Sequence, residues 1–263
     1  NVALGDGSMS AVQAGADSNT VVGHSALSSL TTGDQNSAFG RGTLNNVTTG
    51  SYNSALGFAS LNQNTGQYNT AVGAGSLQLN TTASNNTAVG YKAGYSNTTG
   101  AYNTFLGDIA GRDNTTGSAN TAVGYGSMFE GTTTGSSNTA VGTVSMQNLS
   151  SGSYNVAIGT DSLKANTTAS QNTAVGYQSL YTNTTGASLS AVGVGALYAN
   201  TTGSNNVAMG TSSLVSNTTG ASNTGLGRDA LRSNTTASNN TAVGYLALTA
   251  NTTADYNTAV GGN

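Results

Sequence analysis

The segment Asn172-Thr173-Ala174-Val175-Gly176 recurs in recognisable form along the whole chain. Its glycine is found at Gly5, Gly23, Gly40, Gly57, Gly73, Gly90, Gly107, Gly124, Gly142, Gly159, Gly176, Gly193, Gly210, Gly227, Gly244 and Gly261. These glycines lie about 17 residues apart, and a fixed period this short indicates one small structural unit that stacks on copies of itself. We number each repeat from this glycine as position 0, so that Val175 is at position −1 and Leu180 at +4.

The residues before the repeat glycine predict a short β-strand. Position −1 is apolar in every copy, and position −2 is Ala except at Val21, Phe105 and Gly225. Position −4 is Asn in every copy except at Leu189. Thr and Val favour a pleated backbone, whereas Asn, Thr, Val and Gly are poor helix formers. A strand is therefore expected in each repeat.

The segment from +2 to +5, such as Gln178–Tyr181, predicts a second strand in each repeat. Its Leu at +4 is expected to point into the core, with the small residue at +3 pointing the other way. Position +4 is Leu or Met except at Gly94 and Gly111, which belong to adjacent repeats. Two neighbouring glycines are expected to thin the core and to create a bend or a weak point there.

Alternation along the first strand separates its side chains into two rows. Positions −3 and −1 share one face, and positions −4 and −2 share the other. We expect Val at −1 to fill the core together with Leu at +4, and the small Ala row at −2 to face another chain. The alternative is that Ala only avoids bulk on an exposed face. The Asn residues at −4 are expected to form a side-chain amide ladder, interrupted at Leu189.

The motif Asn-Thr-Thr-Gly or Asn-Thr-Thr-Ala predicts an exposed corner, because the three repeats of unusual length all change in this part. Its Asn begins Asn-x-Ser/Thr motifs, which could carry N-linked glycans if the source has that modification. The alternative is that Asn and Thr are present for turn hydrogen bonds. The candidate glycosylation residues are Asn80, Asn97, Asn114, Asn166, Asn183, Asn200, Asn217, Asn234 and Asn251.

Together these patterns predict an all-β protein, a parallel β-solenoid or β-roll of about 15 rungs of about 17 residues each. Residues 1–263 are expected to form a single repeat domain. No capping segment is visible at either end, so the chain is expected to be a segment of a longer fibre.

Composition argues against several kinds of function. Charged residues make up 6% of the chain, the net charge is −3, and the six basic residues are scattered. This distribution excludes the basic stripe that nucleic-acid binding needs. No apolar run is long enough for membrane insertion, and the absence of Cys excludes disulfides and thiolate metal sites.

Catalysis is not expected, and no catalytic, cofactor-binding or metal-binding residue is predicted. The single histidine, His24, is at the variable position +1, where stacking would place it between Asp6 and Arg41 with Ser25 beside it. A Ser–His–acid relay also needs a pocket and an oxyanion site. We interpret these residues as a surface charge row.

Tyrosines flank the predicted strand at positions −5 and +1. They could form stacking platforms for cell-surface glycans, but the favoured interpretation is that they cover the edge of the stack. The tyrosines concerned are Tyr52, Tyr68, Tyr102, Tyr154 and Tyr256 at −5, and Tyr91, Tyr125, Tyr177 and Tyr245 at +1.

The pattern at 172–185 and 240–253, Asn-Thr-Ala-Val-Gly-Tyr-x-Ala/Ser-Leu-x-x-Asn-Thr-Thr, resembles repeats of phage and prophage tail-fibre proteins. It is also similar to the shorter head repeats of trimeric autotransporter adhesins. The resemblance implies a homotrimeric, left-handed parallel β-roll that forms an extracellular shaft or adhesive head on a cell surface, filament or virion fibre. Two alternatives remain open: an ice-binding solenoid with regular Thr ranks, and a glycosylated surface filament.

Overall fold

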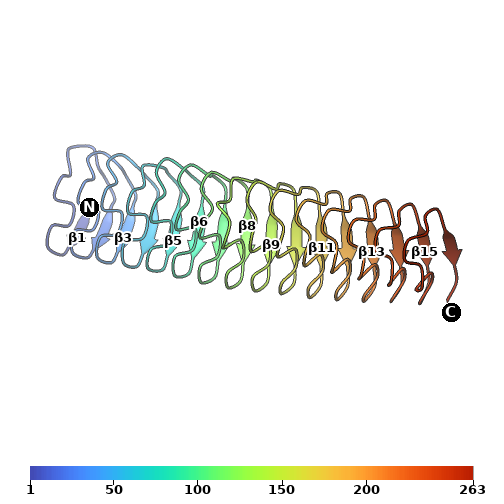
Figure 1. Cartoon of the computed structure of the whole chain (residues 1–263). Helices are drawn as coiled ribbons and strands as arrows, with labels where there is room; N and C mark the ends of the chain where they lie inside the picture. Colours follow the sequence, from blue (N-terminus) through green and yellow to red (C-terminus); the bar gives the residue numbers. More distant parts are fainter. Residues whose placement is uncertain (263) are drawn as a thin grey trace. The chain divides into compact units, whose positions relative to one another are not determined.

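The computed structural model describes residues 1–262 and divides the chain into two compact units, Asn1–Thr134 and Gly135–Asn263. Each unit is a stack of coils, where one coil is one turn of about 17 residues (Figure 1). The predicted parallel β-solenoid is confirmed: it has about 15 turns, and residues 1–262 contain no helix.

Each coil contains one strand of three residues, which occupies positions −3 to −1. In the first unit the strands are β1 (Val2–Leu4), β2 (Thr20–Val22), β3 (Ser37–Phe39), β4 (Ser54–Leu56), β5 (Thr70–Val72), β6 (Thr87–Val89), β7 (Thr104–Leu106) and β8 (Thr121–Val123). Neighbours in sequence pair in parallel and in register, so that Ala88 lies beside Phe105.

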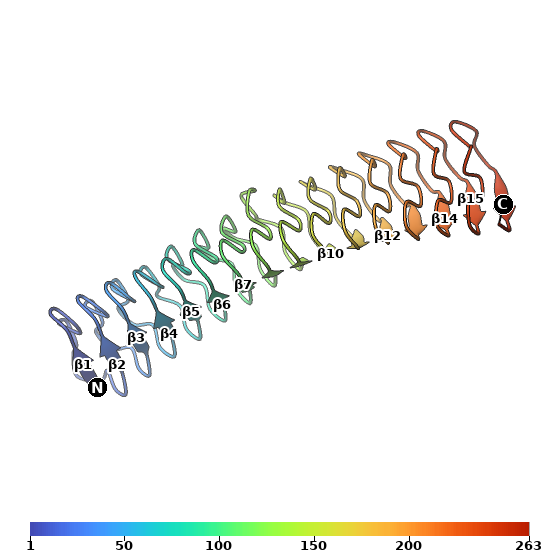
Figure 2. The same cartoon turned by 90° about the horizontal axis from the view of Figure 1, so that it is seen from below.

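The second unit repeats this arrangement. Its strands are β9 (Thr139–Val141), β10 (Val156–Ile158), β11 (Thr173–Val175), β12 (Ser190–Val192), β13 (Val207–Met209), β14 (Thr224–Leu226), β15 (Thr241–Val243) and β16 (Thr258–Val260). Here too each strand pairs in parallel with the next one along the chain, for example Val175 with Val192. Figure 2 shows that within each unit the strands lie along one side of the coils.

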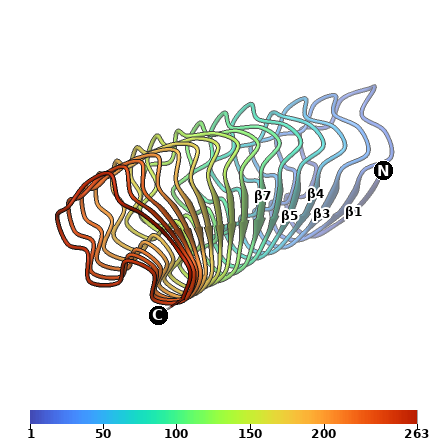
Figure 3. The same ribbon diagram turned by 90° about the vertical axis from the view of Figure 1, so that its right-hand side faces the viewer.

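The predicted second strand at +2 to +5 is wrong, because this segment is a run of turns. Position +4 has a left-handed backbone, with φ of 52° at Leu180, and position +2 does too, with φ of 54° at Gln178. The amide of Gln178 donates to the preceding coil at Thr160 O (3.1 Å), whereas that of Leu180 donates to the following coil at Ala196 O (3.0 Å). The turns therefore bond to both neighbouring coils while reversing the chain within few residues (Figure 3).

The two rows of the strand face the opposite way from the prediction. The row at −2 is buried, with Ala88 and Ala174 fully inaccessible, and Leu180 at +4 is fully buried as well. The row at −1 faces outward, so the expectation that Val at −1 fills the core is wrong, as is the idea that the Ala row faces another chain. A 17-residue coil has a thin interior. An Ala beneath a Leu fills it, and a second large side chain would overfill it.

The expected amide ladder at −4 is confirmed. Within the core, the backbone amide of Asn172 donates to Asn155 Oδ1 (3.0 Å) and its Nδ2 donates to Gly186 O (3.0 Å). Leu189 interrupts this ladder as expected: its own amide still donates to Asn172 Oδ1 (3.0 Å), but its side chain offers no oxygen to the next coil. The buried Asn residues thus satisfy backbone groups that the thin core would otherwise leave unpaired.

Gly94 and Gly111 do not leave the core thin, because Phe105 fills the space beside them. A Cβ added to Gly94 would lie 2.5 Å from the Phe105 ring, and one added to Gly111 would lie 2.2 Å from it. Phe105 is itself fully buried at position −2, where other coils have Ala. One ring therefore occupies the space of two missing leucine side chains, and the expectation that the core is thinned there is wrong.

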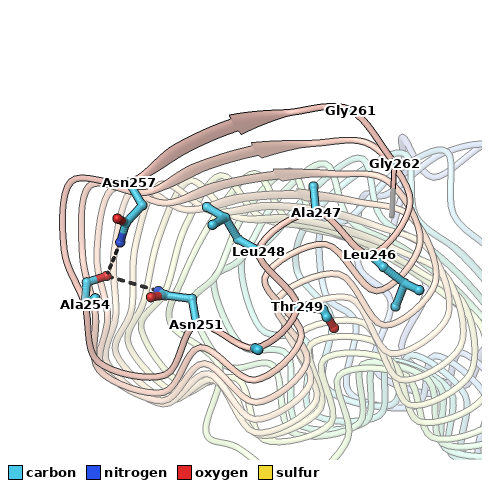
Figure 4. Close-up of a pocket in the computed structure, with 10 residues that line it drawn as sticks. Leu246, Ala247, Leu248, Thr249, Asn251, Ala254, Asn257, Gly261 and Gly262 are labelled. Atoms are coloured by element: carbon cyan, nitrogen blue, oxygen red, sulfur yellow. Dashed lines mark hydrogen bonds between the residues drawn. The ribbon is translucent and has the colours of Figure 1, made fainter.

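The last described coil displays the core in cross-section (Figure 4). Leu248, Asn251 and Asn257 point into its interior. The side-chain Nδ2 groups of Asn251 and Asn257 both donate to Ala254 O at 3.0 Å. The hollow lined by these residues corresponds to the interior that, in other coils, the following coil covers. It is a section of the core and not a separate ligand site.

Candidate interaction surface

The outward face of the strands is apolar in both units. In residues 1–134, the −1 side chains of Val22 and Leu56 are 38% and 52% exposed, and in the second unit that of Met209 is 47% exposed. The adjoining −3 position presents hydroxyl groups, such as those of Thr87 and Thr104, which are exposed. We call this surface of −1 and −3 side chains the outer sheet face.

An exposed apolar row of this regularity is unusual on a monomer. Contiguous apolar patches beyond a few hundred Å² mark interaction sites. The row includes Val, Leu, Ile, Met and Phe; some of these side chains are exposed, as at Leu56, and others are half-buried, as at Val175. The outer sheet face is therefore the leading candidate for an interaction surface, and it was assigned to the core in the sequence-based interpretation.

The repeat glycine keeps this face flat at its edge. Gly176 has φ of +132°, and a Cβ there would lie 2.6 Å from Gly193 O on the next coil. A side chain at position 0 would push adjacent coils apart, so the chain leaves each strand without any side chain at the boundary.

The tyrosines predicted to flank the strand are exposed, but they differ in what covers their rings. Tyr52 and Tyr68 occupy position −5 of adjacent coils, and their rings stack at 4.9 Å. Tyr181 and Tyr198, at position +5, stack in the same way at 5.1 Å. Tyr91 and Tyr125, at position +1 of coils that are not adjacent, have no such ring partner among residues 1–262.

All six basic residues lie between positions +1 and +5, on the side of the coil that carries the turns; they are Arg41, Lys92, Arg112, Lys164, Arg228 and Arg232. We call this side the turn flank. Most of these cations are neutralised locally: Arg112 binds Asp113 through two bonds (2.9 and 2.7 Å) and Lys164 binds Asp161 (2.9 Å). The hydrogen bond to Asp113 raises the pKa of Arg112 above its usual value, although burial opposes this.

His24 lies on the turn flank with the neighbours that the sequence predicts. Its Nε2 is 3.8 Å from Asp6 Oδ2, and its Nδ1 is 3.1 Å from Ser25 Oγ. The His24 and Asp6 side chains are largely exposed, so water screens their interaction. This matches the expected surface charge row.

The candidate glycosylation residues lie mostly inside the coil. Asn80, Asn97, Asn114, Asn166, Asn183, Asn200, Asn217 and Asn234 are fully buried, and Asn251 is partly exposed. They form a second amide ladder; for example, Asn97 Nδ2 donates to Asn80 Oδ1 (2.7 Å) and to Gly100 O (2.9 Å). Nδ2 is the atom that an N-linked glycan modifies, and the folded coil has no room for a sugar at these eight residues. In a typical corner the second threonine, such as Thr185, is exposed, and the first, such as Thr184, is half-buried.

Within residues 1–262 no group of three or more His, Cys, Asp or Glu side chains could hold a metal ion. The same residues include no helix of the length and apolar character needed to cross a membrane. Comparison of the chain with protein family models, with curated proteins and with solved structures found no match.

Proposed function

We propose that this chain is a non-catalytic structural shaft or adhesive segment of an extracellular fibre, and that it self-associates as a homotrimer through the outer sheet face. The observation that carries the proposal is the row of exposed Val, Leu, Ile and Met side chains at −1. Burying this row between copies removes apolar area from water at about 25 cal/mol per Å².

The internal structure of each unit supports a mechanical role. Within each unit, coils bond to their neighbours through strand pairing, through the turns and through buried amide ladders, which are interrupted where another residue replaces Asn, as at Leu189. Bonds repeated at each coil couple neighbouring coils, so that local opening is opposed from both sides. Such a stack suits a spacer that resists proteolysis and keeps a fixed distance.

The proposal is tested by light scattering of the purified chain. We expect a mass of three times the chain mass of 25.8 kDa. A variant carrying Val89→Lys and Leu106→Lys, on adjacent strands β6 and β7, should lose self-association while keeping its circular dichroism spectrum. Thr99→Lys, at the exposed corner, is the matched control and should remain trimeric. A monomeric wild-type chain at high concentration would refute the self-association.

Ice binding is a second candidate, and one structural observation favours it. The −3 threonines were expected to be buried beside core Val, but they lie on the outer sheet face. Thr70, Thr87, Thr104 and Thr121 form an unbroken rank on β5 to β8, spaced by about 4.8 Å as parallel strands are. A flat rank of hydroxyl and methyl groups could order water.

The two candidates make opposite demands on the same face, because ice binding needs it uncovered. Thermal hysteresis measurements distinguish them. A monomeric chain with hysteresis that is lost in Thr104→Lys would favour ice binding, whereas a trimer without hysteresis would favour the fibre.

A further inference from the structure

We propose that the turn flank of residues 1–134 binds a neutral, hydroxyl-rich glycan chain along a row of three aromatic side chains. The row consists of Phe58, Tyr91 and Tyr125, with Ala74 and Asp108 between them, and we call it the aromatic row. This inference deepens the adhesive role proposed above and rests on it.

The aromatic row follows from the repeat, because all five residues occupy position +1 of consecutive coils. Backbone hydrogen bonds hold these positions side by side: Ile109 N donates to Tyr91 O (2.8 Å) and Gly126 N donates to Asp108 O (3.1 Å). Phe58, Tyr91 and Tyr125 are 59%, 52% and 56% exposed. Three half-exposed aromatic side chains therefore alternate with short residues along one line.

The alternation leaves space for a ring. Aromatic side chains at the same position of adjacent coils stack on each other at 4.9 and 5.1 Å, which fills the space between them. Alternate coils lie twice as far apart, at about 9.6 Å, so that a ring midway between two of them lies about 4.8 Å from each. That separation is within the range at which ring systems stack. The gaps over Ala74 and Asp108 each accept one sugar ring.

The polar groups beside the gaps suit sugar hydroxyls. Asp108 is exposed, and the ion pairs among residues 1–262 include neither Asp108 nor Lys92. The Lys92 ammonium lies 5.2 Å from the Tyr91 ring centre and 5.5 Å from that of Tyr95. One free carboxylate accepts hydrogen bonds from hydroxyl groups, and one free ammonium donates to them.

The same charges favour a neutral ligand over an acidic one. Asp108 lies in the row itself, Asp113 and Glu130 come directly after the turn flank at position +6, and Arg112 is already paired with Asp113. A carboxylate or sulfate on the ligand would be repelled by the Asp108 carboxylate in the row itself, and Lys92, beside Tyr91, is the one unpaired cation of residues 1–262 close to the two gaps. A regular aromatic spacing also matches a polymer of rigid rings better than a flexible peptide.

Affinity electrophoresis in gels containing cellulose ether, starch, galactomannan or dextran tests the inference. We expect at least one of these polysaccharides to retard the wild-type chain. Tyr125→Ala should weaken binding about ten-fold, since it removes one stacking face from one gap, and Tyr91→Ala should weaken binding more, since Tyr91 borders both gaps. Alanine occurs naturally at position +1 as Ala74, so these variants are compatible with the fold. Asp108→Ala should weaken binding, and Asp108→Asn should retain part of it.

The matched control is Tyr102→Ala. Tyr102 is an exposed tyrosine of the same unit, but it is at position −5, before the strand. The Tyr102→Ala variant should therefore bind the polysaccharide as the wild-type chain does. No retardation by any of the four polymers would overturn the inference, as would equal loss in Tyr102→Ala. Light scattering on the same samples separates the two proposals: a monomer that binds glycan refutes the trimer alone, and a trimer that binds none refutes the glycan site alone.

Discussion

Positions −2 and −1 are consecutive residues of every strand, and the sixteen copies allow their tolerances to be compared. At Phe105 and at Gly225 the inner position departs from Ala, and there the surroundings change with it. Phe105 comes with Gly94 and Gly111, and at Gly225 a Cβ would lie 2.6 Å from the Ser213 hydroxyl, which instead donates to Gly225 O (2.9 Å).

The outer position behaves differently. Phe39, Leu56, Ile158 and Met209 all replace Val there, although their side chains differ in volume, and all four are exposed. The inner row is thus selected for volume, and the outer row for apolar character alone. An apolar requirement without a volume requirement differs from the requirement of a packed interior, where volume is constrained.

The largest expected effect comes from placing a charge on each row in turn. Ala174→Asp buries an unpaired carboxylate and should lower the free energy of unfolding by about 4 kcal/mol. Val175→Asp puts the same group on the outer sheet face and should leave the monomer's unfolding midpoint nearly unchanged. Urea unfolding of both variants, under conditions where each is monomeric, makes the measurement. Equal destabilisation by the two would contradict the orientation of the strands.

The second test removes the Phe105 ring, which fills the space left by Gly94 and Gly111. Phe105→Ala leaves a cavity bordered by Gly94 and Gly111 and should cost about 3 kcal/mol. Adding Gly94→Leu and Gly111→Leu should restore most of this stability, because leucine occupies position +4 in other coils with the same left-handed backbone. The two leucines added to the wild-type chain should instead destabilise it by overpacking. A triple variant no more stable than Phe105→Ala would show that the three sites are not coupled.

Much of the fold could be predicted from the period alone, since a 17-residue repeat of strand-forming residues leaves few alternatives to a solenoid. The amide ladder at −4 also followed from the recurrence of Asn. The orientation of the strand was mistaken because hydrophobicity favoured Val over Ala as the core residue. Because side chains alternate along a strand, a buried Asn172 requires that Ala174 is buried as well. The sequence also shows that Phe replaces Ala at 105 where Gly replaces Leu at 94 and 111, and this joint change indicates that positions −2 and +4 share one interior.

The turns and the candidate site were less predictable. Left-handed backbone at Gln178 and Leu180 is imposed by closing a short coil, and neither residue type indicates it. The tyrosines were identified correctly as flanking the strand. Stacked pairs such as Tyr52 and Tyr68 lie on adjacent coils, whereas Tyr91 and Tyr125 lie two coils apart and do not stack on each other.

A third test extends the comparison to the other inner position, −4. Asn172→Leu would copy the natural exception at Leu189 and place two interruptions on adjacent coils. The Leu189 amide, which now donates to Asn172 Oδ1, would lose its acceptor inside the core, so we expect a loss of about 2 kcal/mol. Gln171→Leu, one residue earlier and exposed, is the control and should be nearly neutral. Hydrogen exchange at the Leu189 amide reports the effect directly, and unchanged protection would rule out the ladder as a source of stability.

The smallest expected effect concerns a residue of the turn and not of the strand. In the turn, backbone conformation and not side-chain volume determines which substitutions are tolerated. Ser212 is at position +2 and has a φ of +56°, a backbone conformation that glycine adopts without strain. Other coils have glycine at this position, as at Gly195. Ser212→Gly should therefore raise the free energy of unfolding by about 0.5 kcal/mol, even though glycine increases the entropy of the unfolded chain. Ser216, four residues later, has no such backbone, so Ser216→Gly should destabilise the protein. Thermal unfolding of the two variants tests this opposition of sign. If both substitutions lowered the melting temperature, the left-handed residues of the turn would be unstrained, and the recurrence of glycine at +2 would need another cause.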